Sequence, residues 1–412
     1  FNMKDFLQKA KQASKIVATL QGDRRKTVLN AMAAALRSNT KTIVAENSKD
    51  LLYAKENDLS SALLDRLLLD EARIDAMAIS LEDIALLRDP IGRILEGWTN
   101  DNGLKMQKIS IPIGVIGVIY ESRPNVTSDV AGLCFKSGNV AILKGGKEAI
   151  NSNLIIATTL QDVLEAHDLP REAVAMIPDT SREGVSKLIK EDAYLDLIIP
   201  RGGEALIRYV NENATVPVVK HDKGLCHIFV EKSADFEMAD SIIVNAKTQR
   251  PGVCNALETL LVDNAIASEY LPRIKKVLEG HGTKLIGCEA TQKVIDVIAA
   301  TEEDWHTEYL ENTLSIKVIA DTQSAITHID TYGSGHSDAI LTSNMVASEL
   351  FMDSVDSACV YVNASTRFTD GAAFGFGAEV GISTNKLHSR GPMGINDLTT
   401  YKFKVFGNGH IR

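Results

Sequence analysis

Before the first proline, Pro90, apolar residues recur at the spacing of α-helices. One apolar group spans residues 16–20 and a second spans 28–36, with Ala and Leu abundant throughout. The turn-forming sequence at 89–92, Asp-Pro-Ile-Gly, then interrupts the pattern. The sequence therefore predicts a helical region over about the first 95 residues.

After this break the chain alternates between strand and helix. Residues 109–120 are β-branched and apolar, and they predict one buried strand. Further strands are predicted at 139–143, 173–177, 195–199 and 216–220, and helices at 150–167, 181–190 and 204–211. Repeated units of this length indicate a doubly wound parallel sheet.

A second alternating block follows and indicates a second α/β domain with its own sheet. It predicts strands at 227–230, 257–262, 284–286 and 316–319, and helices at 236–248 and 265–278. The chain then becomes rich in glycine. A late strand predicted at 398–403 is suited to pairing with another subunit.

Composition and charge limit the classes of function. Hydrophobic residues make up 45% and charged residues 24%, which supplies a core and argues against a disordered chain. The net charge of −10 argues against bulk nucleic-acid binding. We also expect no membrane partner, because no apolar run is long enough to span a bilayer, and no signal peptide, because the first residues lack an apolar core.

The five cysteines are scattered and contain no Cys-x-x-Cys pair. Their odd number and spacing argue against a disulfide framework and a zinc site, and no two histidines have metal-ligand spacing. We therefore expect no metal ligands and a reducing, cytoplasmic location.

Two glycine turns are candidate phosphate sites. Lys144-Gly145-Gly146-Lys147 follows a predicted strand directly, where glycines let backbone N–H groups approach a phosphate and lysines add charge. It matches neither a P-loop nor GxGxxG, so a simple basic turn stays open. The second turn is Pro200-Arg201-Gly202-Gly203, between a strand and a helix. Two such turns on one parallel sheet indicate a polyphosphate ligand such as a dinucleotide.

Cys254 is the candidate nucleophile. It lies in a polar, glycine-bearing segment after a predicted helix, with Arg250 nearby, and a cationic neighbour favours the thiolate. The other four cysteines lie in apolar contexts typical of packing. Asn125 follows the strand at 109–120, where its amide could hold an oxyanion or simply form a turn with Pro124. The residues alone do not decide between these two readings.

Five longer motifs together resemble those of the γ-glutamyl phosphate reductase family, in the aldehyde dehydrogenase superfamily. The resemblance runs over essentially the whole chain from Met3. Its most specific segments are YESRPNVT at 120–127, LKGGKEA at 143–149, QRPGVCNALET at 249–259, GAEVGIS at 377–383 and RGPMG at 390–394.

This resemblance implies an aldehyde-dehydrogenase-like α/β fold with two doubly wound domains and a small β flap for oligomerisation. Residues 1–100 and 114–225 would form the NADP-binding domain and 226–375 the catalytic domain. Residues 101–113 and 383–412 would form the flap.

The resemblance also implies roles for single residues. Cys254 would be the nucleophile and Asn125 an oxyanion ligand. Lys144 would bind the adenosine ribose and Glu308 the nicotinamide ribose.

Two departures from the general aldehyde dehydrogenase pattern bear on cofactor and direction. NAD-using relatives often have Glu three residues after the lysine at 144. Here Lys147 stands in that place, and a cation favours a 2′-phosphate, so we expect NADPH/NADP. Oxidising relatives have a Glu base that activates water. The matching stretch here, 218–224, has no Glu, which favours the reductive direction because no water is activated to destroy a thioester.

The implied reaction is the NADPH-dependent reduction of L-glutamyl 5-phosphate to L-glutamate 5-semialdehyde and phosphate through a cysteine thioester, in proline biosynthesis. We expect Ser365, Thr366 and Arg367 to bind the substrate α-carboxylate and Glu121 its α-amino group. We also expect a homodimer or a dimer of dimers. Glutamate 5-kinase is a candidate partner.

Two other functions stay open. An NAD-dependent aldehyde dehydrogenase working oxidatively would not require phosphate. A non-catalytic protein on the same scaffold would bind nucleotide without chemistry, although the intact motif around Cys254 argues against it. The absence of a P-loop argues against a kinase.

Overall fold

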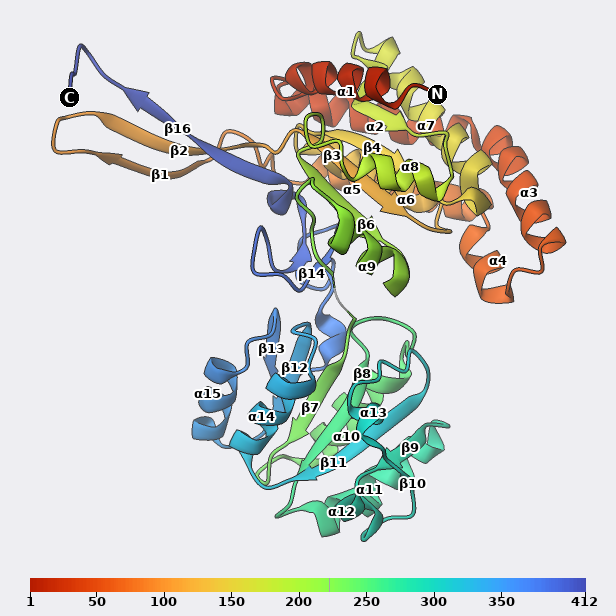
Figure 1. Ribbon diagram of the computed structural model, residues 1–412, viewed down its shortest axis with the longest axis vertical. Helices are drawn as coiled ribbons and strands as arrows, with labels where there is room; N and C mark the ends of the chain where they lie inside the picture. Colours follow the sequence, from red (N-terminus) through yellow and green to blue (C-terminus); the bar gives the residue numbers. More distant parts are fainter. Residues whose placement is uncertain (222) are drawn as a thin grey trace. The chain divides into compact units, whose positions relative to one another are not determined.

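The chain divides into two compact units in a computed structural model that describes residues 1–221 and 223–412 (Figure 1). Unit 1 comprises Phe1–Lys220, Gly375–Gly381 and Met393–Arg412. Unit 2 comprises His221–Phe374 and Ile382–Pro392. Asp222, part of the stretch in which we expected no catalytic Glu, lies outside the described residues.

These limits differ in detail from the domain boundaries expected from the resemblance. The chain leaves unit 1 at 220 rather than at 225, and residues 382–392 belong to unit 2 rather than to the flap. The assignment of cofactor binding to one unit and catalysis to the other stays a prediction.

Unit 1 begins with helices, as predicted. They are α1 (Met3–Val17), α2 (Gly22–Ser38), α3 (Thr40–Glu56), α4 (Ser61–Leu67) and α5 (Glu71–Leu86). Local caps start several of them; the Asp70 side chain, for example, accepts a hydrogen bond from the Arg73 N–H at the start of α5. Helices α2 and α5 pack against each other and against α6 (Asn125–Lys136), with Leu29 and Leu81 buried.

A four-stranded parallel sheet follows in unit 1, with the order β5-β4-β3-β6. Its strands are β3 (Val115–Tyr120), β4 (Val140–Lys144), β5 (Val174–Met176) and β6 (Leu197–Arg201). The helices after α6 are α7 (Ile150–Ala166), α8 (Arg182–Leu188) and α9 (Glu204–Asn213), and the 3₁₀ turns are η1 (Lys147–Ala149) and η2 (Arg171–Ala173). The predicted doubly wound parallel arrangement is confirmed for this sheet.

Two strand predictions in unit 1 are wrong. Residues 109–120 are not one strand but the end of β2 (Lys105–Pro112) and all of β3. Gly114, with φ +131°, turns the chain between them, and its N–H bonds to the Asn139 Oδ1 instead of a strand. Residues 216–220 form no strand, only an isolated bridge between Val218 and Ile198.

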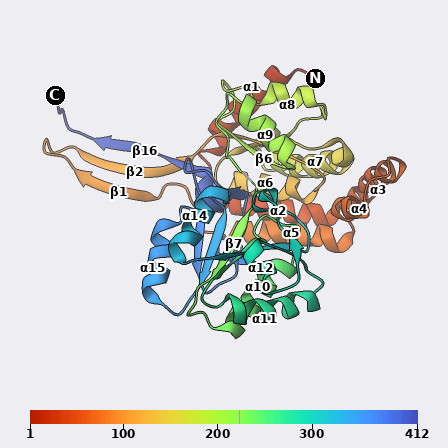
Figure 2. The same cartoon turned by 60° about the horizontal axis from the view of Figure 1, so that its bottom comes forward.

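Strand β2 belongs to a separate three-stranded antiparallel sheet of unit 1 with the order β1-β2-β16. Strand β1 is Ile94–Thr99 and β16 is Thr399–Phe406. Both views show this sheet extending away from the helices of its own unit (Figure 1 and Figure 2). The sheet starts before the expected flap segment 101–113. The predicted late strand exists, and within this chain it pairs with β2.

Unit 2 is built on a seven-stranded parallel sheet with the order β10-β9-β11-β8-β7-β12-β13. The strands are β7 (Cys226–Val230), β8 (Leu257–Asp263), β9 (Lys284–Gly287), β10 (Ile298–Ala299), β11 (Thr313–Ile319), β12 (Ser337–Leu341) and β13 (Cys359–Val362). The helices are α10 (Phe236–Thr248), α11 (Ala267–Gly280), α12 (Glu289–Gln292), α13 (Glu302–Trp305), α14 (Thr322–Tyr332) and α15 (Met345–Ser354). Short 3₁₀ turns, η3 (Thr366–Phe368) and η4 (Ile395–Leu398), and the strand pair β14 (Gly381–Ser383) and β15 (Gly391–Met393) complete the chain.

Alternation along the strands of unit 2 creates two apolar cores, one on each face of the sheet. Ile228 lies in register between Leu260 and Ala339, and all three pack with α10 and α11. Their neighbours along the strands point to the opposite face, where Phe229 packs with α14 and α15. The second predicted α/β domain is therefore confirmed, although β12, β13, α14 and α15 were not predicted.

Candidate active site

Three loops meet at one edge of the unit 1 sheet. Strands β4, β3 and β6 are adjacent and parallel, so their carboxyl ends bring together the turns at 145–146, 121–124 and 202–203. The chain moves from β3 outward through β4 and β5 and then returns to β6 beside β3. Such a reversal in strand order is where open α/β sheets bind ligands.

Two of these loops are linked to the third by carboxylates. The Glu121 Oε2 accepts a hydrogen bond from the Gly203 N–H at 3.0 Å, at the start of α9. The Glu148 Oε1 accepts bonds from the Ser122 N–H at 3.0 Å and from its hydroxyl at 2.7 Å. Ser122, with φ +30°, needs such support because non-glycine residues rarely adopt that conformation.

At three glycines of these turns a Cβ would come within 3 Å of a neighbouring side chain. A Cβ on Gly145 would overlap the Asn153 amide, and one on Gly146 would lie 2.7 Å from the Glu148 carboxyl carbon. A Cβ on Gly202 would lie 2.8 Å from the Glu121 carboxyl carbon. These loops therefore present main chain at the sheet edge, as a bound phosphate requires.

The two lysines of the first turn differ in environment. Lys144, the last residue of β4, is only 2% exposed, and burial lowers the pKa of its ammonium although Asp179 and Glu148 oppose this shift. Lys147, at the start of η1, is exposed. Only Lys147 can therefore approach a ligand group from solvent without rearrangement.

Asn125 is the first residue of α6 and is exposed. It was placed in a loop by the sequence, whereas here it begins a helix. Its amide nitrogen lies 3.4 Å from the Asp129 Oδ2, one turn along. Asp129 is half-buried, and burial raises the pKa of its carboxyl group.

Cys254 lies in unit 2, in the turn between α10 and the amino end of β8. Its side chain is half-buried and forms no disulfide. The Cys226 thiol, at the start of β7, donates to the Cys254 carbonyl oxygen at 3.3 Å. A Cβ on Gly224 would overlap the same carbonyl group. The main chain at Cys254 is therefore held between β8 and the segment that leads into β7.

Burial raises the pKa of the Cys134 and Cys226 thiols, which disfavours their thiolates. Cys288 departs from the expected inert role. Burial raises the pKa of its half-buried thiol, but hydrogen bonds from Thr291 and from the Val318 N–H outweigh this and lower it. A charged form of Cys288 is thus partly supported, which the apolar sequence around it did not indicate.

The predicted carboxylate-binding residues lie against the Cys254 turn. The Arg367 guanidinium bonds to the Asn255 Oδ1 and, through Nε, to the Gln249 Oε1 at 3.1 Å. The buried Thr366 hydroxyl donates to the Asn255 carbonyl at 2.8 Å, and Ser365 caps the Arg367 N–H. Of the three, Arg367 carries the charge that a carboxylate needs, and burial lowers the pKa of its guanidinium, as does nearby Arg250.

Glu308 joins the same region of unit 2. Its Oε1 accepts a hydrogen bond from the Gly224 N–H at 3.0 Å. Because Gly224 packs against Cys254, the carboxylate predicted to bind the nicotinamide ribose is placed close to the predicted nucleophile.

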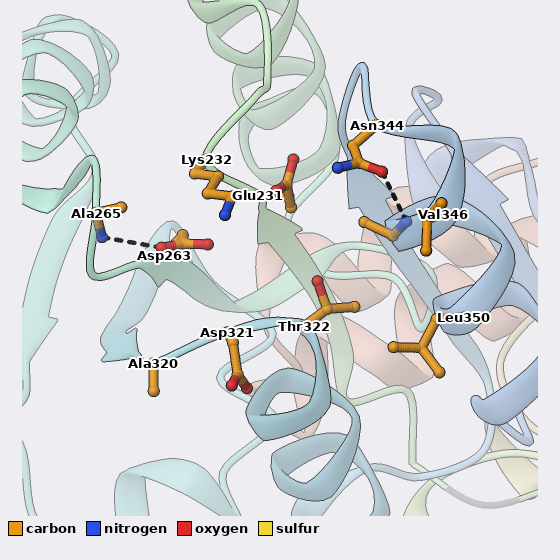
Figure 3. Close-up of a pocket in the computed structure, with 11 residues that line it drawn as sticks. Glu231, Lys232, Asp263, Ala265, Ala320, Asp321, Thr322, Asn344, Val346 and Leu350 are labelled. Atoms are coloured by element: carbon orange, nitrogen blue, oxygen red, sulfur yellow. Dashed lines mark hydrogen bonds between the residues drawn. The ribbon is translucent and has the colours of Figure 1, made fainter.

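A separate pocket of about 300 Å³ lies at the carboxyl edge of the unit 2 sheet, the edge opposite the Cys254 turn (Figure 3). Glu231, Asp263 and Asp321 line it with Lys232, and apolar Val346 and Leu350 close one side. Three carboxylates make it a poor phosphate site. Among the described residues no group of three or more His, Cys, Asp or Glu side chains is arranged so that it could hold a metal ion, and no helix could cross a membrane.

Three contact residues around Cys254 were not singled out from the sequence: Gly224, Cys226 and Glu258. Glu258 offered a signal, because it is a charged residue inside the otherwise apolar strand Leu257–Asp263 and must find a buried partner. Gly224 and Cys226 offered none, since their roles depend on contacts with a distant segment.

Comparisons with known proteins identify relatives over the whole chain. The model of the aldehyde dehydrogenase family matches residues 2–286. The gamma-glutamyl phosphate reductase of Nautilia profundicola is 64% identical over 410 residues, which cover 100% of both chains. A crystal structure of gamma-glutamyl phosphate reductase from Thermotoga maritima superposes with a TM-score of 0.98 at 45% identity, over 99% of each chain.

A more distant structure shares the fold. An acetylating aldehyde dehydrogenase from Geobacillus thermoglucosidasius has a TM-score of 0.69 at 15% identity, covering 99% of this chain and 97% of the other. The expected aldehyde-dehydrogenase-like α/β fold is thereby confirmed, as is the family resemblance read from the motifs. The chain belongs to the γ-glutamyl phosphate reductase family, a branch of the aldehyde dehydrogenase family.

Proposed function

We propose that this chain reduces L-glutamyl 5-phosphate to L-glutamate 5-semialdehyde and phosphate, with NADPH as reductant, in proline biosynthesis. The observation that carries the proposal is the clamped, half-buried Cys254 beside Glu308 and Arg367, in a chain whose full-length relatives are named for this reaction. The enzyme is accordingly an oxidoreductase.

Cys254 supplies the covalent step. Its thiolate attacks the acyl carbon, the S–C bond forms, and the C–O bond to phosphate breaks. Phosphate leaves with the bonding electrons and is a good leaving group because it is a weakly basic anion. The resulting thioester replaces one difficult reduction with two easier steps. The Cys254 N–H and the Asn125 side-chain amide are the proposed donors to the tetrahedral oxyanion, the role of Asn125 being carried over from the resemblance.

The residues of unit 1 fit a nicotinamide dinucleotide. Gly145, Gly146, Gly202 and Gly203 offer main chain next to Lys144 and the start of α9, and at the first three a Cβ would lie within 3 Å of a neighbouring side chain. Pro200 and Arg201 end the strand that leads into this turn. When bound, the nicotinamide supplies the hydride that reduces the thioester to the aldehyde level. The Cys254 sulfur is then the leaving group that frees the product.

NADPH is preferred to NADH in this proposal because Lys147 is exposed beside the first turn, where its ammonium can pair with a 2′-phosphate. Arg367 binds the α-carboxylate of the substrate. Ser365 and Thr366 hold the Arg367 turn and the Cys254 turn through the contacts described above. Glu121 is the proposed partner of the α-amino group.

The proposal extends to assembly and location. The sheet of β1, β2 and β16 exposes Trp98, Tyr401 and Phe403, which are the kind of side chains that subunit interfaces cover. A homodimer or dimer of dimers formed through this sheet, a cytoplasmic location, and delivery of the labile acyl phosphate by glutamate 5-kinase complete the proposal.

The test is the phosphate dependence of the reverse reaction. Purified protein is given L-glutamate 5-semialdehyde and NADP⁺ with and without phosphate, and formation of reduced nucleotide is followed by absorbance. Strict phosphate dependence is expected, because only phosphate releases the acyl group from Cys254. Turnover without phosphate would instead identify an oxidative aldehyde dehydrogenase that transfers the acyl group to water.

Two cysteine variants complete the test. C254S is expected to remove the reaction, whereas C288S, which changes another half-buried cysteine of unit 2, is expected to keep it. Nucleotide binding without any turnover in the parent protein would support a non-catalytic role.

A further inference from the structure

A buried ion pair closes the base of the segment that carries Cys254. Lys247 lies at the end of α10 and Glu258 near the start of β8, and neither side chain is exposed. The Lys247 Nζ lies 3.3 Å from the Glu258 Oε2 and donates to the Leu257 carbonyl at 2.8 Å. The pair therefore fixes where the Cys254 segment leaves the helix and where it enters the strand.

Glu258 also holds a third segment. Its Oε2 accepts a hydrogen bond from the Tyr309 N–H at 3.1 Å, and the Leu310 N–H lies 3.4 Å from its Oε1. Leu310 has φ +55°, a conformation that bulky residues keep only where their surroundings enforce it. These two residues directly follow Glu308, so Glu258 sets the path of the chain at Glu308.

The contacts close a ring around the predicted nucleophile. Glu308 accepts the hydrogen bond from Gly224, and Gly224 packs against Cys254. Cys254 is joined through its own segment to Glu258, and Glu258 is joined through two amides to the Glu308 segment. Three segments of unit 2, around Gly224, residues 254–258 and residues 308–310, are thus joined by part-buried hydrogen bonds and one close main-chain contact.

Stability is a weak reason for this ion pair. Burial raises the pKa of Glu258 to about 7, although the Lys247 ammonium and the Tyr309 amide lower it, and burial lowers the pKa of Lys247. Both directions follow from the cost of removing a charged group from water. Buried ion pairs can often be replaced by apolar residues without loss of stability. In some proteins such pairs instead specify one geometry.

We propose that Glu258, held by Lys247, is a positioning residue that keeps Glu308 in register with Cys254. It touches neither substrate nor cofactor and acts through the main chain at residues 309–310. The proposal rests on the proposed function for its consequence in catalysis, because that function gives Glu308 the nicotinamide ribose and Cys254 the thioester.

The test compares E258Q with a matched control, E231Q. Glu231 is also a buried carboxylate of unit 2, with Ser233 and Thr342 as partners, but it lies beyond the opposite end of β7. The first measurement is hydrogen exchange of the amides at 308–311 in the nucleotide-free proteins. In E258Q we expect exchange there to accelerate about tenfold or more, because the charged acceptor is lost. In E231Q we expect no change at these amides.

The second measurement is steady-state kinetics. E258Q is expected to raise the KM for NADPH and to lower kcat by about tenfold each, because the Glu308 carboxylate is misplaced. In an E308Q background, E258Q should add less than about twofold, since both changes then act on one contact. Full additivity of E258Q and E308Q, or equal effects of E258Q and E231Q, would overturn the proposal.

A second variant covers failure of E258Q to fold. The double variant K247M/E258M removes both charges with little change in volume, and it also removes the acceptor for the two amides. Accelerated exchange at 308–311 in a folded K247M/E258M protein supports the proposal, and unchanged exchange contradicts it.

The experiments distinguish failure of the proposed function from failure of the positioning role of Glu258. If the parent protein shows no phosphate-dependent reaction, the proposed function fails, whereas the hydrogen-exchange comparison still decides whether Glu258 holds the Glu308 segment.

Discussion

The main chain of Gly224 lies against that of Cys254 so closely that a methyl group on Gly224 would sit 2.6 Å from the Cys254 Cα. The same Cys254 carbonyl accepts a hydrogen bond from the Cys226 thiol. The nucleophile segment is therefore fixed by a contact with main chain, which has no flexible end that could move aside. This relationship makes the absence of a side chain at 224 a condition for the position of Cys254.

G224A is expected to displace the Cys254 turn and to lower kcat by about 100-fold, since a shift of about 1 Å in a reacting group costs that much. The rate at which iodoacetamide alkylates Cys254 should also differ between G224A and the parent protein. This rate is measured by mass spectrometry of the peptide that contains Cys254. G280A is the control, because a Cβ on Gly280 meets no atom within 4 Å. Normal kcat in G224A would show that the turn can move without consequence.

R367Q should separate substrate recognition from positioning. If the guanidinium binds the α-carboxylate, the KM for L-glutamate 5-semialdehyde rises about tenfold or more, as expected for loss of a charged hydrogen bond. Butanal, which has no carboxylate, should be turned over at a rate within about threefold of the parent. R273Q, which changes an exposed arginine of α11, is the control. An equal loss with both aldehydes would mean that Arg367 only supports Asn255.

K147E should reverse the nucleotide preference. A carboxylate repels the 2′-phosphate of NADPH and suits the free hydroxyl of NADH, so the ratio of kcat/KM for NADPH over NADH should fall about 100-fold. The same charge change at exposed Lys41 on α3 should leave the ratio unchanged. A ratio unaffected by K147E would show that Lys147 does not contact the 2′ position.

His328 makes unit 2 sensitive to acid. It packs with Trp305 and Tyr332, and burial lowers the pKa of its imidazole from 6.5 to about 2, with His227 and Lys317 acting in the same direction. Below pH 6.5 the unfolded chain binds a proton that the folded chain refuses, so stability is present at neutral pH and is lost as the pH falls.

H328F is therefore expected to flatten the decline in unfolding free energy between pH 7 and pH 4. It removes the titrating group, and the Nε2 that it replaces is buried without a partner among the described residues. Urea unfolding at several pH values, followed by tryptophan fluorescence, measures this slope. H281Q, at an exposed histidine, should keep the parent slope. Identical slopes for H328F and the parent would contradict the prediction.

Local patterns predicted the elements whose ends have local causes. The helix predicted at 236–248 has those limits in α10, because the Asp235 side chain caps its first turn. The strand predicted at 109–120 failed because a single glycine, Gly114, sends the two halves of an apolar run into different sheets. Apolar character does not encode which sheet a residue joins.

In the candidate site too, only the features that depend on local sequence could be predicted. In unit 1 the turns at 145–146 and 202–203 follow strands, where parallel sheets place their ligands, and sequence order was sufficient to find them. The Cys254 turn lies at the amino end of β8 instead, and its surroundings come from Gly224, Glu258 and Glu308. These residues meet only after folding, so the resemblance, and not spacing, indicated Glu308.

Strand β16 completes a sheet whose other two strands, β1 and β2, come much earlier in the chain. The main segment of unit 2, His221–Phe374, lies between β2 and β16 in the sequence. During synthesis, unit 2's main segment can therefore emerge and begin to fold while the β1–β2 hairpin still exposes an unpaired edge. Such long-range closure is slow. The nucleophile segment can therefore form before the edge of β2 is protected, and this hairpin stays open to wrong pairing until the last residues of the chain are made.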